Sequence, residues 1–262
     1  MRVLATYNIK GGVGKTATAV NIAYLAARDG FRVLLWDLDP QSAATFLFRV
    51  QPKVKGGGKA LVAGKRPVDD AIKATDFPNL DLLPADFTYR NLDLHLDSER
   101  KPATRLRALL APLRREYDLV VLDCPPSISL LSENVLHAAD LLLVPLIPTT
   151  LSVRTLEQLT EFIAGFDGKR PRILAFFSMV DGRKRLHREI AEELRASRND
   201  VAATAIPSLS AIERMSVGRQ PVAALAPRSQ AARYYCELWL EARDRARLGV
   251  SQARGQTGSA PG

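Results

Sequence analysis

The chain has 262 residues, of which 47 % are apolar, which excludes general disorder and allows one α/β domain with a sizeable core. Its formal charge of +9 indicates an acidic partner, with nucleic acid ahead of an anionic membrane, although free use of arginine would give the same excess. The two cysteines and three histidines lack the spacing of a metal cluster, and no apolar run approaches the roughly 20 residues of a membrane span. Two unpaired cysteines without a signal peptide favour a reducing, cytoplasmic location.

Short apolar runs alternate with longer helical patterns, which is typical of a parallel sheet covered on both faces. Strands are predicted at residues 3–8, 32–37, 80–83, 119–123, 141–147, 173–178 and 201–206. Helices are predicted at residues 16–28, 104–116, 130–137, 152–164, 186–196 and 229–247. The predicted fold is a single α/β domain over residues 1–249, with a mostly parallel twisted sheet of about seven or eight strands and helices on both faces.

Two stretches differ from the rest of the chain. Residues 51–66 contain three consecutive glycines and five basic residues but no acidic one, so a mobile loop is predicted there. Residues 250–262 are rich in Gly, Ser, Gln and Ala and are predicted to be a disordered polar tail.

Residues 10–16, Lys-Gly-Gly-Val-Gly-Lys-Thr, stand where a predicted strand ends and a predicted helix begins. Their glycines allow backbone N–H groups to point at an anion, and the helix adds the positive end of its dipole. Lys15 would reach the β- and γ-phosphates of a nucleotide and Thr16 would bind Mg²⁺, as in a P-loop NTPase. The common pattern G-x-x-x-x-G-K-[ST] fails, however, because Ile9 replaces its first glycine and Lys10 adds a second lysine. The residues predicted to bind the nucleotide in this run are Lys10, Gly11, Gly12, Val13, Gly14, Lys15, Thr16 and Ala17.

Two buried-strand patterns end in carboxylates, which places these groups at the C-terminal edge of the sheet, where ligands of open α/β folds bind. The first pattern ends in Asp37 and continues to Asp39, and the second ends in Asp123. Asp123 would hold a water on Mg²⁺, because that ion takes hard oxygen ligands near the phosphates. An aspartate at a strand end often only caps the next helix, but the two patterns and the glycine-rich loop together favour a magnesium–nucleotide site.

The run Lys-Gly-Gly-x-Gly-Lys-Thr resembles the deviant Walker A motif of the ParA/MinD family of ATPases, and the chain looks most similar to small, Soj-like ParA proteins. The resemblance implies ATP and Mg²⁺ as cofactors and a homodimer with two ATP molecules in its interface. It further implies that Lys10 acts on the nucleotide of the other subunit, that Asp39 positions the attacking water and that Asp37 supports the metal shell. The predicted catalytic residues are Lys10, Lys15 and Asp39, and the predicted metal residues are Thr16, Asp37 and Asp123.

Softer matches extend the resemblance over nearly the whole ordered chain. Residues 177–183 resemble the family segment after its sixth strand, and Ile206-Pro207 resembles the start of its adenine-side loop. Met179 and Pro207 are therefore predicted to contact the base, although either could equally be core or turn material. Cys124 begins a segment similar to the family's switch after Walker B, and is best explained as a small buried residue.

The chain also departs from the family pattern. Residues 42–45 read Ser-Ala-Ala-Thr where the family commonly has Gly-Asn-Ala-Thr, and Ser208 stands where an arginine is common. The second departure weakens any direct transfer of the family's DNA-contacting residues and suggests a divergent branch.

Basic residues that could bind non-specific DNA gather at the start of one predicted helix, four of them within six positions. The predicted DNA-binding residues are Arg183, Lys184, Arg185 and Arg188 in that group, with Arg214 and Arg219 further on. The alternative is a solvated helix whose glutamates pair locally with these bases. Because no helix-turn-helix region precedes the glycine-rich loop, sequence-specific operator binding is not expected.

The resemblance implies a cytoplasmic, nucleoid-associated ATPase that dimerises with ATP, binds non-specific DNA in that state, and is reset when a ParB-like or other cargo adaptor stimulates hydrolysis. Its cargo would be a plasmid, a chromosome or a large protein assembly. A MinD-like membrane-associated ATPase is an alternative, since the last predicted helix contains Tyr234, Tyr235, Leu238 and Trp239. The end of this helix is polar, however, so docking of the helix onto its own domain is the simpler interpretation, and no membrane partner is expected. A nucleotide-gated adaptor with negligible hydrolysis is another alternative, and an iron–sulfur ATPase is disfavoured because no cysteine pair is available.

Overall fold

The computed structural model describes residues 1–65, 67–166 and 168–249. Eight strands in these residues form one sheet in the order β3-β4-β2-β5-β1-β6-β7-β8, parallel except for the β3–β4 pair at one edge. The strands are β1 (Arg2–Thr6), β2 (Val33–Asp37), β3 (Lys73–Ala74), β4 (Leu80–Leu83), β5 (Leu119–Asp123), β6 (Leu141–Leu146), β7 (Arg172–Val180) and β8 (Val201–Pro207). The predicted α/β fold class and all seven predicted strands are confirmed.

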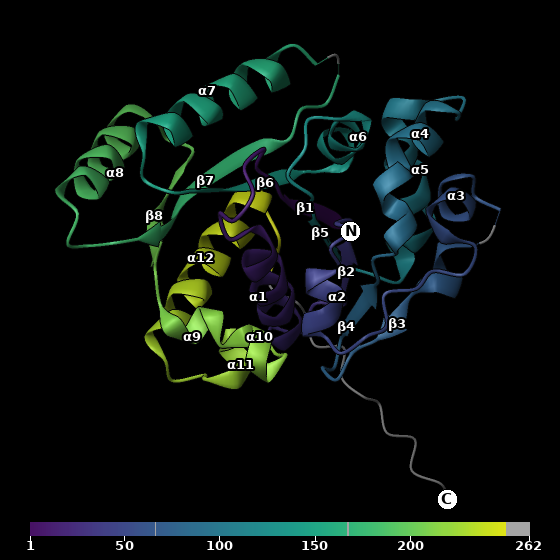
Figure 1. Ribbon diagram of the computed structural model, residues 1–262, viewed down its shortest axis with the longest axis horizontal. Coiled ribbons are helices and arrows are strands. Elements are labelled where there is room, and N and C mark those ends of the chain that lie inside the picture. Colours follow the sequence, from purple (N-terminus) through teal and green to yellow (C-terminus); the bar gives the residue numbers. More distant parts are fainter. Residues whose placement is uncertain (66, 167, 250–262) are drawn as a thin grey trace, which may run out of the picture.

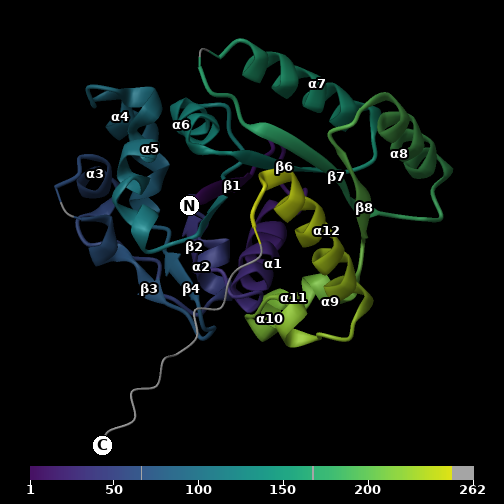
Figure 2. The same ribbon diagram turned by 180° about the vertical axis from the view of Figure 1, so that it is seen from behind.

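Helices cover both faces of the sheet (Figures 1 and 2). The α-helices are α1 (Lys15–Arg28), α2 (Ala43–Leu47), α3 (Gly57–Val62), α4 (Leu92–Asp97), α5 (Arg105–Leu110), α6 (Leu130–Ala138), α7 (Thr150–Ala164), α8 (Arg185–Ser197), α9 (Ser210–Glu213), α10 (Met215–Gly218), α11 (Val222–Leu225) and α12 (Gln230–Ala246). Short 3₁₀ turns are η1 (Val68–Ala71), η2 (Phe87–Asn91), η3 (Pro102–Thr104) and η4 (Pro112–Arg115).

The core consists of two apolar layers, one on each face of the sheet. Alternate residues of β5 show the division: Leu119 and Val121 pack in the layer of α1 and α12, whereas Val120 and Leu122 pack in the layer of α3 to α8. Because both faces of each central strand are covered, their sequences are continuously apolar rather than alternating. The same burial leaves the polar residues at the strand ends as the only ones that can reach a ligand at the edge of the sheet.

Two predictions about the segments beside the sheet were wrong. The described part of residues 51–66 is not a mobile loop, because it contains helix α3, whose Leu61 and Val62 are buried. The single helix predicted at residues 104–116 is divided into α5 and η4 at Pro112, which lacks the N–H group that would continue the helix. Strand β3 and the short helices α2, α4 and α9 to α11 were not predicted, and the predicted tail at 250–262 lies outside the described residues.

Helix α12 docks onto its own domain, as the simpler interpretation predicted. Its Tyr235, Leu238 and Trp239 are almost completely buried, and the Trp239 indole donates a hydrogen bond of 2.8 Å to Asp29 beside α1. These aromatic and apolar side chains of α12 are therefore used in packing against its own domain. Within the described residues, no helix has the length and apolar character needed to cross a bilayer.

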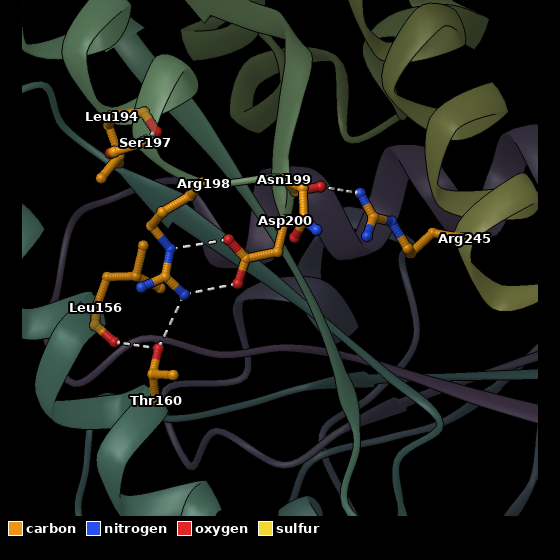
Figure 3. Close-up of polar contacts among 8 residues, drawn as sticks. All are labelled: Leu156, Thr160, Leu194, Ser197, Arg198, Asn199, Asp200 and Arg245. Carbon is orange, nitrogen blue, oxygen red and sulfur yellow. Dashed lines mark hydrogen bonds and ion pairs between the residues drawn. The ribbon is translucent and has the colours of Figure 1, made fainter.

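A polar network fixes the connection between α8 and β8 to the helices around it (Figure 3). The Arg198 guanidinium donates to both carboxylate oxygens of Asp200, at 2.8 and 2.6 Å, and to the Thr160 hydroxyl of α7 at 3.1 Å. From the opposite side, Arg245 of α12 donates to the Asn199 carbonyl at 2.6 Å. The two planar guanidinium groups thus hold the turn before β8 in one orientation. They also fix the position of β8, which ends in Pro207, one of the residues predicted to contact the nucleotide base.

Candidate nucleotide and magnesium site

The loop between β1 and α1 has the geometry of an anion cradle. Gly12 and Gly14 have positive φ angles of 70° and 94°, which residues with a Cβ rarely adopt. Gly14 is the N-cap of α1, and no described side chain caps this helix or places an acidic group in its first turn. The first N–H groups of a 14-residue helix therefore remain available for an anion, assisted by the helix dipole.

Neighbouring strands hold this loop in place. Asn8 donates from Nδ2 to the Pro145 carbonyl of β6 at 2.7 Å and accepts from the Lys10 N–H at 2.9 Å. A Cβ on Gly14 would lie only 2.9 Å from the Ser178 hydroxyl oxygen of β7, so only glycine fits there. Asn8 and Ser178 were not identified from the sequence, because their role depends on strands that are distant in the chain.

Lys15 and Lys10 occupy different environments. Lys15 is only 7 % exposed, and its ammonium donates to the Lys10 carbonyl at 2.8 Å. Burial lowers the pKa of Lys15, while the nearby Asp123 acts in the opposite direction. Lys10 is partly exposed, its ammonium has no partner among the described residues, and it does not line the cavity next to the loop.

Two buried aspartates lie opposite each other on adjacent parallel strands, Asp37 at the end of β2 and Asp123 at the end of β5. Asp37 accepts hydrogen bonds from the Thr45 N–H at 2.8 Å, the Thr45 hydroxyl at 2.7 Å and the Asp39 N–H at 3.2 Å. Burial nevertheless raises the pKa of Asp37 to about 6. Burial, together with the charge of Asp37, also raises the pKa of Asp123 well above its usual value.

Asp123 fits the predicted role in holding Mg²⁺. Its Oδ1 accepts from the Thr6 hydroxyl at 3.3 Å, but its Oδ2 is buried with no hydrogen-bond partner in the described part of the chain. An unpaired buried carboxylate oxygen is costly, and a cation with its waters is the kind of partner that would satisfy it. The Thr16 hydroxyl lies close enough to lower the pKa of Asp123, so the two predicted metal residues are neighbours.

The site does not form a metal cage of its own. The described residues contain no group of three or more His, Cys, Asp or Glu side chains that could hold a metal. Both Asp37 oxygens already accept hydrogen bonds from the chain, so any support from Asp37 to the metal would be indirect. This arrangement suits Mg²⁺, which in nucleotide sites takes one or two protein oxygens and completes its shell with phosphates and water.

Asp39 and Thr45 follow β2 at the same edge of the sheet. Asp39 is partly exposed, lines the cavity beside the loop, and accepts from the Gln41 N–H at 2.9 Å. Thr45 is fully buried, and its hydroxyl also accepts from the Ala85 N–H at 2.9 Å. Thr45 was overlooked in the sequence because a threonine in a short helix gives no signal of a carboxylate partner.

A cavity of about 330 Å³ extends from the loop toward β7 and β8. It is lined by the predicted nucleotide residues Gly11, Gly12, Gly14, Lys15, Thr16, Ala17, Met179 and Pro207, and also by Asp39, Pro126, Ser178, Ile206, Ser208, Leu209, Ile212, Glu213 and Tyr235. Met179 has φ +56° at an irregularity in the β7–β8 register and is 43 % exposed. An irregularity of this kind redirects a side chain, and Met179 here lines the cavity. Two of the predicted nucleotide residues do not line this cavity: Val13, whose side chain is buried, and Lys10.

The predicted DNA-binding residues divide into two groups. Arg183, Lys184, Arg185 and Arg188 are exposed at the start of α8, where Arg183 pairs with Asp181 at 3.0 Å and Arg185 pairs with Glu189 at 2.6 Å. Local pairing, the alternative interpretation, therefore applies to part of this group, while the side chains of Lys184 and Arg188 have no ion pair in the described residues.

The second group lies near α9 and α10. Arg214 is exposed, whereas Arg219 donates to the Phe46 carbonyl at 2.9 Å and lies over the Phe46 ring at 4.4 Å. Arg219 therefore links α10 to α2, and this internal role makes it the weakest of the six DNA candidates.

Comparisons of sequence identify a family and several relatives of this chain. The family described as AAA domain (AAA_31) matches residues 1–175. The chromosome partitioning protein ParA of Caulobacter vibrioides is 36 % identical over 207 residues, which cover 76 % of this chain and 78 % of the relative. The sporulation initiation inhibitor protein Soj of Bacillus subtilis is 31 % identical over 243 residues, which cover 90 % of this chain and 96 % of Soj.

Comparison with solved structures finds proteins of similar fold that were crystallised with a nucleotide. Cobyrinic acid a,c-diamide synthase from Mycobacterium smegmatis, crystallised with ADP and magnesium, is 30 % identical with a TM-score of 0.77, covering 93 % of this chain and 94 % of that one. A variant of McdA from Cyanothece in complex with ATP has a TM-score of 0.82 at 22 % identity, covering 96 % and 98 % of the two chains, which supports the fold alone. The M. smegmatis protein was also crystallised with an ATP analogue and magnesium, and these bound groups agree with the predicted cofactors, ATP and Mg²⁺.

Proposed function

Because the chain belongs to the ParA/MinD family of ATPases, we propose that it is a partitioning ATPase that binds Mg·ATP, dimerises around it, and binds non-specific DNA in that state. A partner adaptor of the ParB type would stimulate hydrolysis and release the DNA. The cycle would distribute a plasmid, a chromosome or a large protein assembly over the nucleoid.

The observation that carries the proposal is the difference between the two lysines of the loop. Lys15 is buried beside Asp123, where it can offset phosphate charge within its own subunit. Lys10 is partly exposed, unpaired among the described residues and outside the cavity, so its ammonium is available to the nucleotide of a second subunit. A two-fold dimer would bring each Lys10 to the opposite site, because an isologous interface repeats every contact.

In this mechanism the protein mainly positions groups and offsets charge. Lys15 and the backbone N–H groups of the loop would bind the β- and γ-phosphates, and Thr16 with Asp123 would hold the magnesium ion that neutralises them. Asp39 would orient the attacking water from the rim of the cavity. Lys10 of the partner subunit would add positive charge when the dimer closes, which links hydrolysis to dimerisation.

The first experiment compares Lys10→Ala and Lys15→Ala with the unchanged chain. We expect Lys10→Ala to lose hydrolysis, with and without the stimulating adaptor, while keeping some ATP binding, and Lys15→Ala to lose both. Turnover is measured by phosphate release and the oligomeric state by light scattering with a slowly hydrolysed ATP analogue. If Lys10→Ala with the adaptor hydrolyses ATP as fast as the unchanged chain does, Lys10 does not act on the nucleotide of the other subunit.

The second experiment tests DNA. The chain is incubated with random-sequence duplex DNA in low salt with ATP, ADP or no nucleotide, and retention is measured on filters. Retention only with ATP is expected, and its absence would contradict the proposed DNA-binding state. ATP turnover that requires an acid and an amine donor, and ignores DNA, would instead favour the activity named for the M. smegmatis relative.

A further inference from the structure

Residues 53–65 present positive charge without local compensation. Four lysines in this segment are exposed and have no ion pair in the described part of the chain, and no acidic residue occurs from 51 to 65. We call them the α3 lysines: Lys53, Lys55, Lys59 and Lys65. The predicted DNA-binding residues of α8 are different, because two of them already pair with carboxylates.

The segment that carries the α3 lysines is packed against the domain. The Val54 N–H donates to Asp86 Oδ2 at 2.8 Å, and the Gly58 N–H donates to the Thr88 hydroxyl at 2.7 Å. A Cβ on Gly58 would lie 3.1 Å from both Leu92 and Tyr89, so the glycines allow α3 to approach α4 and η2 closely. The lysines therefore project from a fixed support, and binding would not require the segment to order first.

Asp86, whose carboxylate is affected by the charge of Lys53, cannot neutralise that charge at the surface. Asp86 is only 7 % exposed, and it accepts N–H groups from Val54 and Thr88 and the Thr88 hydroxyl. These hydrogen bonds, together with the charge of Lys53, lower the pKa of Asp86 despite its burial. Asp86 thus anchors the segment, and the four ammonium groups remain directed to solvent.

The α3 lysines and the basic start of α8 belong to opposite edges of the sheet. Helix α3 packs with α4 and η2 outside β4, near one end of the strand order, and α8 lies beside β8 at the other end (Figures 1 and 2). Both basic segments follow the carboxyl ends of their strands, since α3 is bonded to residues just after β4 and α8 begins just after β7. They therefore both lie at the carboxyl ends of the strands, on either side of the nucleotide loop.

We propose that the α3 lysines form a second contact for the phosphate backbone of duplex DNA, separate from the α8 group. This inference rests on the proposed function and specifies where the DNA binds. Four unpaired ammonium groups, that of Lys59 on α3 and the others on the residues flanking it, suit a polyanion whose charges are closely and regularly spaced. None of the α3 lysines lines a cavity described above, and a folded acidic peptide would need such a groove to gain specificity. Lysine, a point charge on a flexible stem, suits backbone contact without base readout.

The test measures the salt dependence of DNA binding in the ATP state. Each phosphate contact contributes a slope of about −0.9 to the logarithmic plot of affinity against salt, so Lys55→Ala with Lys59→Ala should reduce the slope by about 1.8. Between 50 and 200 mM salt, the loss of affinity of this double variant should be about 12-fold smaller than that of the unchanged chain. A second double variant, Lys53→Ala with Lys65→Ala, should reduce the slope of this plot by a similar amount.

The control is Lys101→Ala with Arg115→Ala, which removes two exposed charges that have no ion pair among the described residues. We expect it to leave the slope unchanged. An equal reduction in the control, or an unchanged slope in Lys55→Ala with Lys59→Ala, overturns the inference, because net charge or another surface would then explain the binding. Absence of ATP-dependent DNA binding in the unchanged chain would instead remove the proposed function itself.

Three further measurements separate a direct DNA contact from a change in the fold and from a membrane contact. ATP turnover without DNA, and dimerisation with an ATP analogue, should be the same in all double variants, and a loss of either shows that the substitutions act through the fold and overturns the inference. Vesicles of anionic phosphatidylglycerol separate DNA from a membrane surface. If the α3 substitutions weaken vesicle binding but not DNA binding, the segment serves a membrane and the inference is wrong.

Discussion

Thr45→Val tests how the chain stabilises its buried carboxylates. The substitution keeps the shape and the backbone N–H that donates to Asp37, but removes the hydroxyl that donates to Asp37 at 2.7 Å and accepts from the Ala85 N–H at 2.9 Å. A hydrogen bond to a charged group contributes about 1.5–3 kcal/mol, and leaving a buried N–H without a partner costs about 1–3 kcal/mol. We therefore expect Thr45→Val to lower the free energy of unfolding by about 3–5 kcal/mol at pH 7.5.

The pH dependence of this effect has a definite sign. The pKa of Asp37 is about 6 in the folded chain, above its usual 3.8, so ionisation of Asp37 destabilises the fold as the pH rises through this range. Losing a donor to the charged form raises this pKa further, so the cost of Thr45→Val is greatest above pH 6. At pH 5, where the folded carboxyl is mostly protonated, the cost should be about 1–2 kcal/mol smaller.

Urea unfolding at pH 5 and pH 7.5, without nucleotide, measures both quantities. Thr45→Ser keeps the hydroxyl and should recover most of the loss at pH 7.5. Thr155→Val is the matched control, because that hydroxyl donates only to the Leu151 carbonyl of its own helix, and its effect should stay within about 0.5 kcal/mol. A cost below about 1 kcal/mol, or a cost equal at both pH values, would refute the argument that the Thr45 hydroxyl stabilises a charged Asp37.

Three other substitutions test the site and its support. Asp123→Asn removes a buried charge that has an unpaired oxygen, so it should raise the free energy of unfolding without Mg²⁺ by about 1–3 kcal/mol and abolish the Mg²⁺-dependent rise in melting temperature with ATP; an undiminished rise would contradict the metal role. Gly14→Ala places a Cβ at φ +94° and 2.9 Å from Ser178, and should cost at least about 2 kcal/mol in urea unfolding and weaken ATP binding, unlike Gly182→Ala, which meets nothing within 4 Å. Gly57→Ala combines φ +66° with a Cβ 2.7 Å from the Thr88 hydroxyl oxygen, so it should lower the free energy of unfolding by at least about 1 kcal/mol in urea. A smaller loss would show that α3 is not tightly packed.

The sequence predicted the central sheet and the phosphate loop well, because both depend on local patterns. Covered parallel strands are continuous apolar runs, and the residues from Lys10 to Thr16 connect β1 to the first turn of α1. Met179 and Pro207 line the same cavity as this loop, although they are far away in the chain, and their contact with the base stays a prediction. For these two residues the prediction depended on a family resemblance and not on any physical pattern in the sequence.

The sequence failed where tertiary packing overrides local composition. Three glycines and five basic residues indicated mobility at 51–66, but the glycines permit close approach to α4 and η2, and buried Leu61 and Val62 anchor the segment. Thr45 and Asn8 were missed for a related reason: their hydrogen bonds join strands and helices that are separated by many residues. Asp86, which anchors α3, likewise carries no motif that would mark it.

The nucleotide site gathers buried charged groups whose electrostatics are unfavourable without a ligand. Asp37 and Asp123 are both buried and face each other across adjacent strands, and burial opposes the charge of Lys15 as well. Such groups destabilise the ligand-free chain, and a bound phosphate–magnesium pair would offset them, since it supplies an anion for Lys15 and a cation for Asp123. Binding of Mg·ATP would then stabilise the chain by more than the contacts of ATP with the protein suggest. Loss of the γ-phosphate on hydrolysis would weaken the carboxyl-end side of the sheet, where Lys10, the α8 basic group and the α3 lysines lie. The DNA release that we propose after hydrolysis would follow from this coupling, because the proposed DNA-binding surfaces lie at the strand ends whose charges the nucleotide would balance.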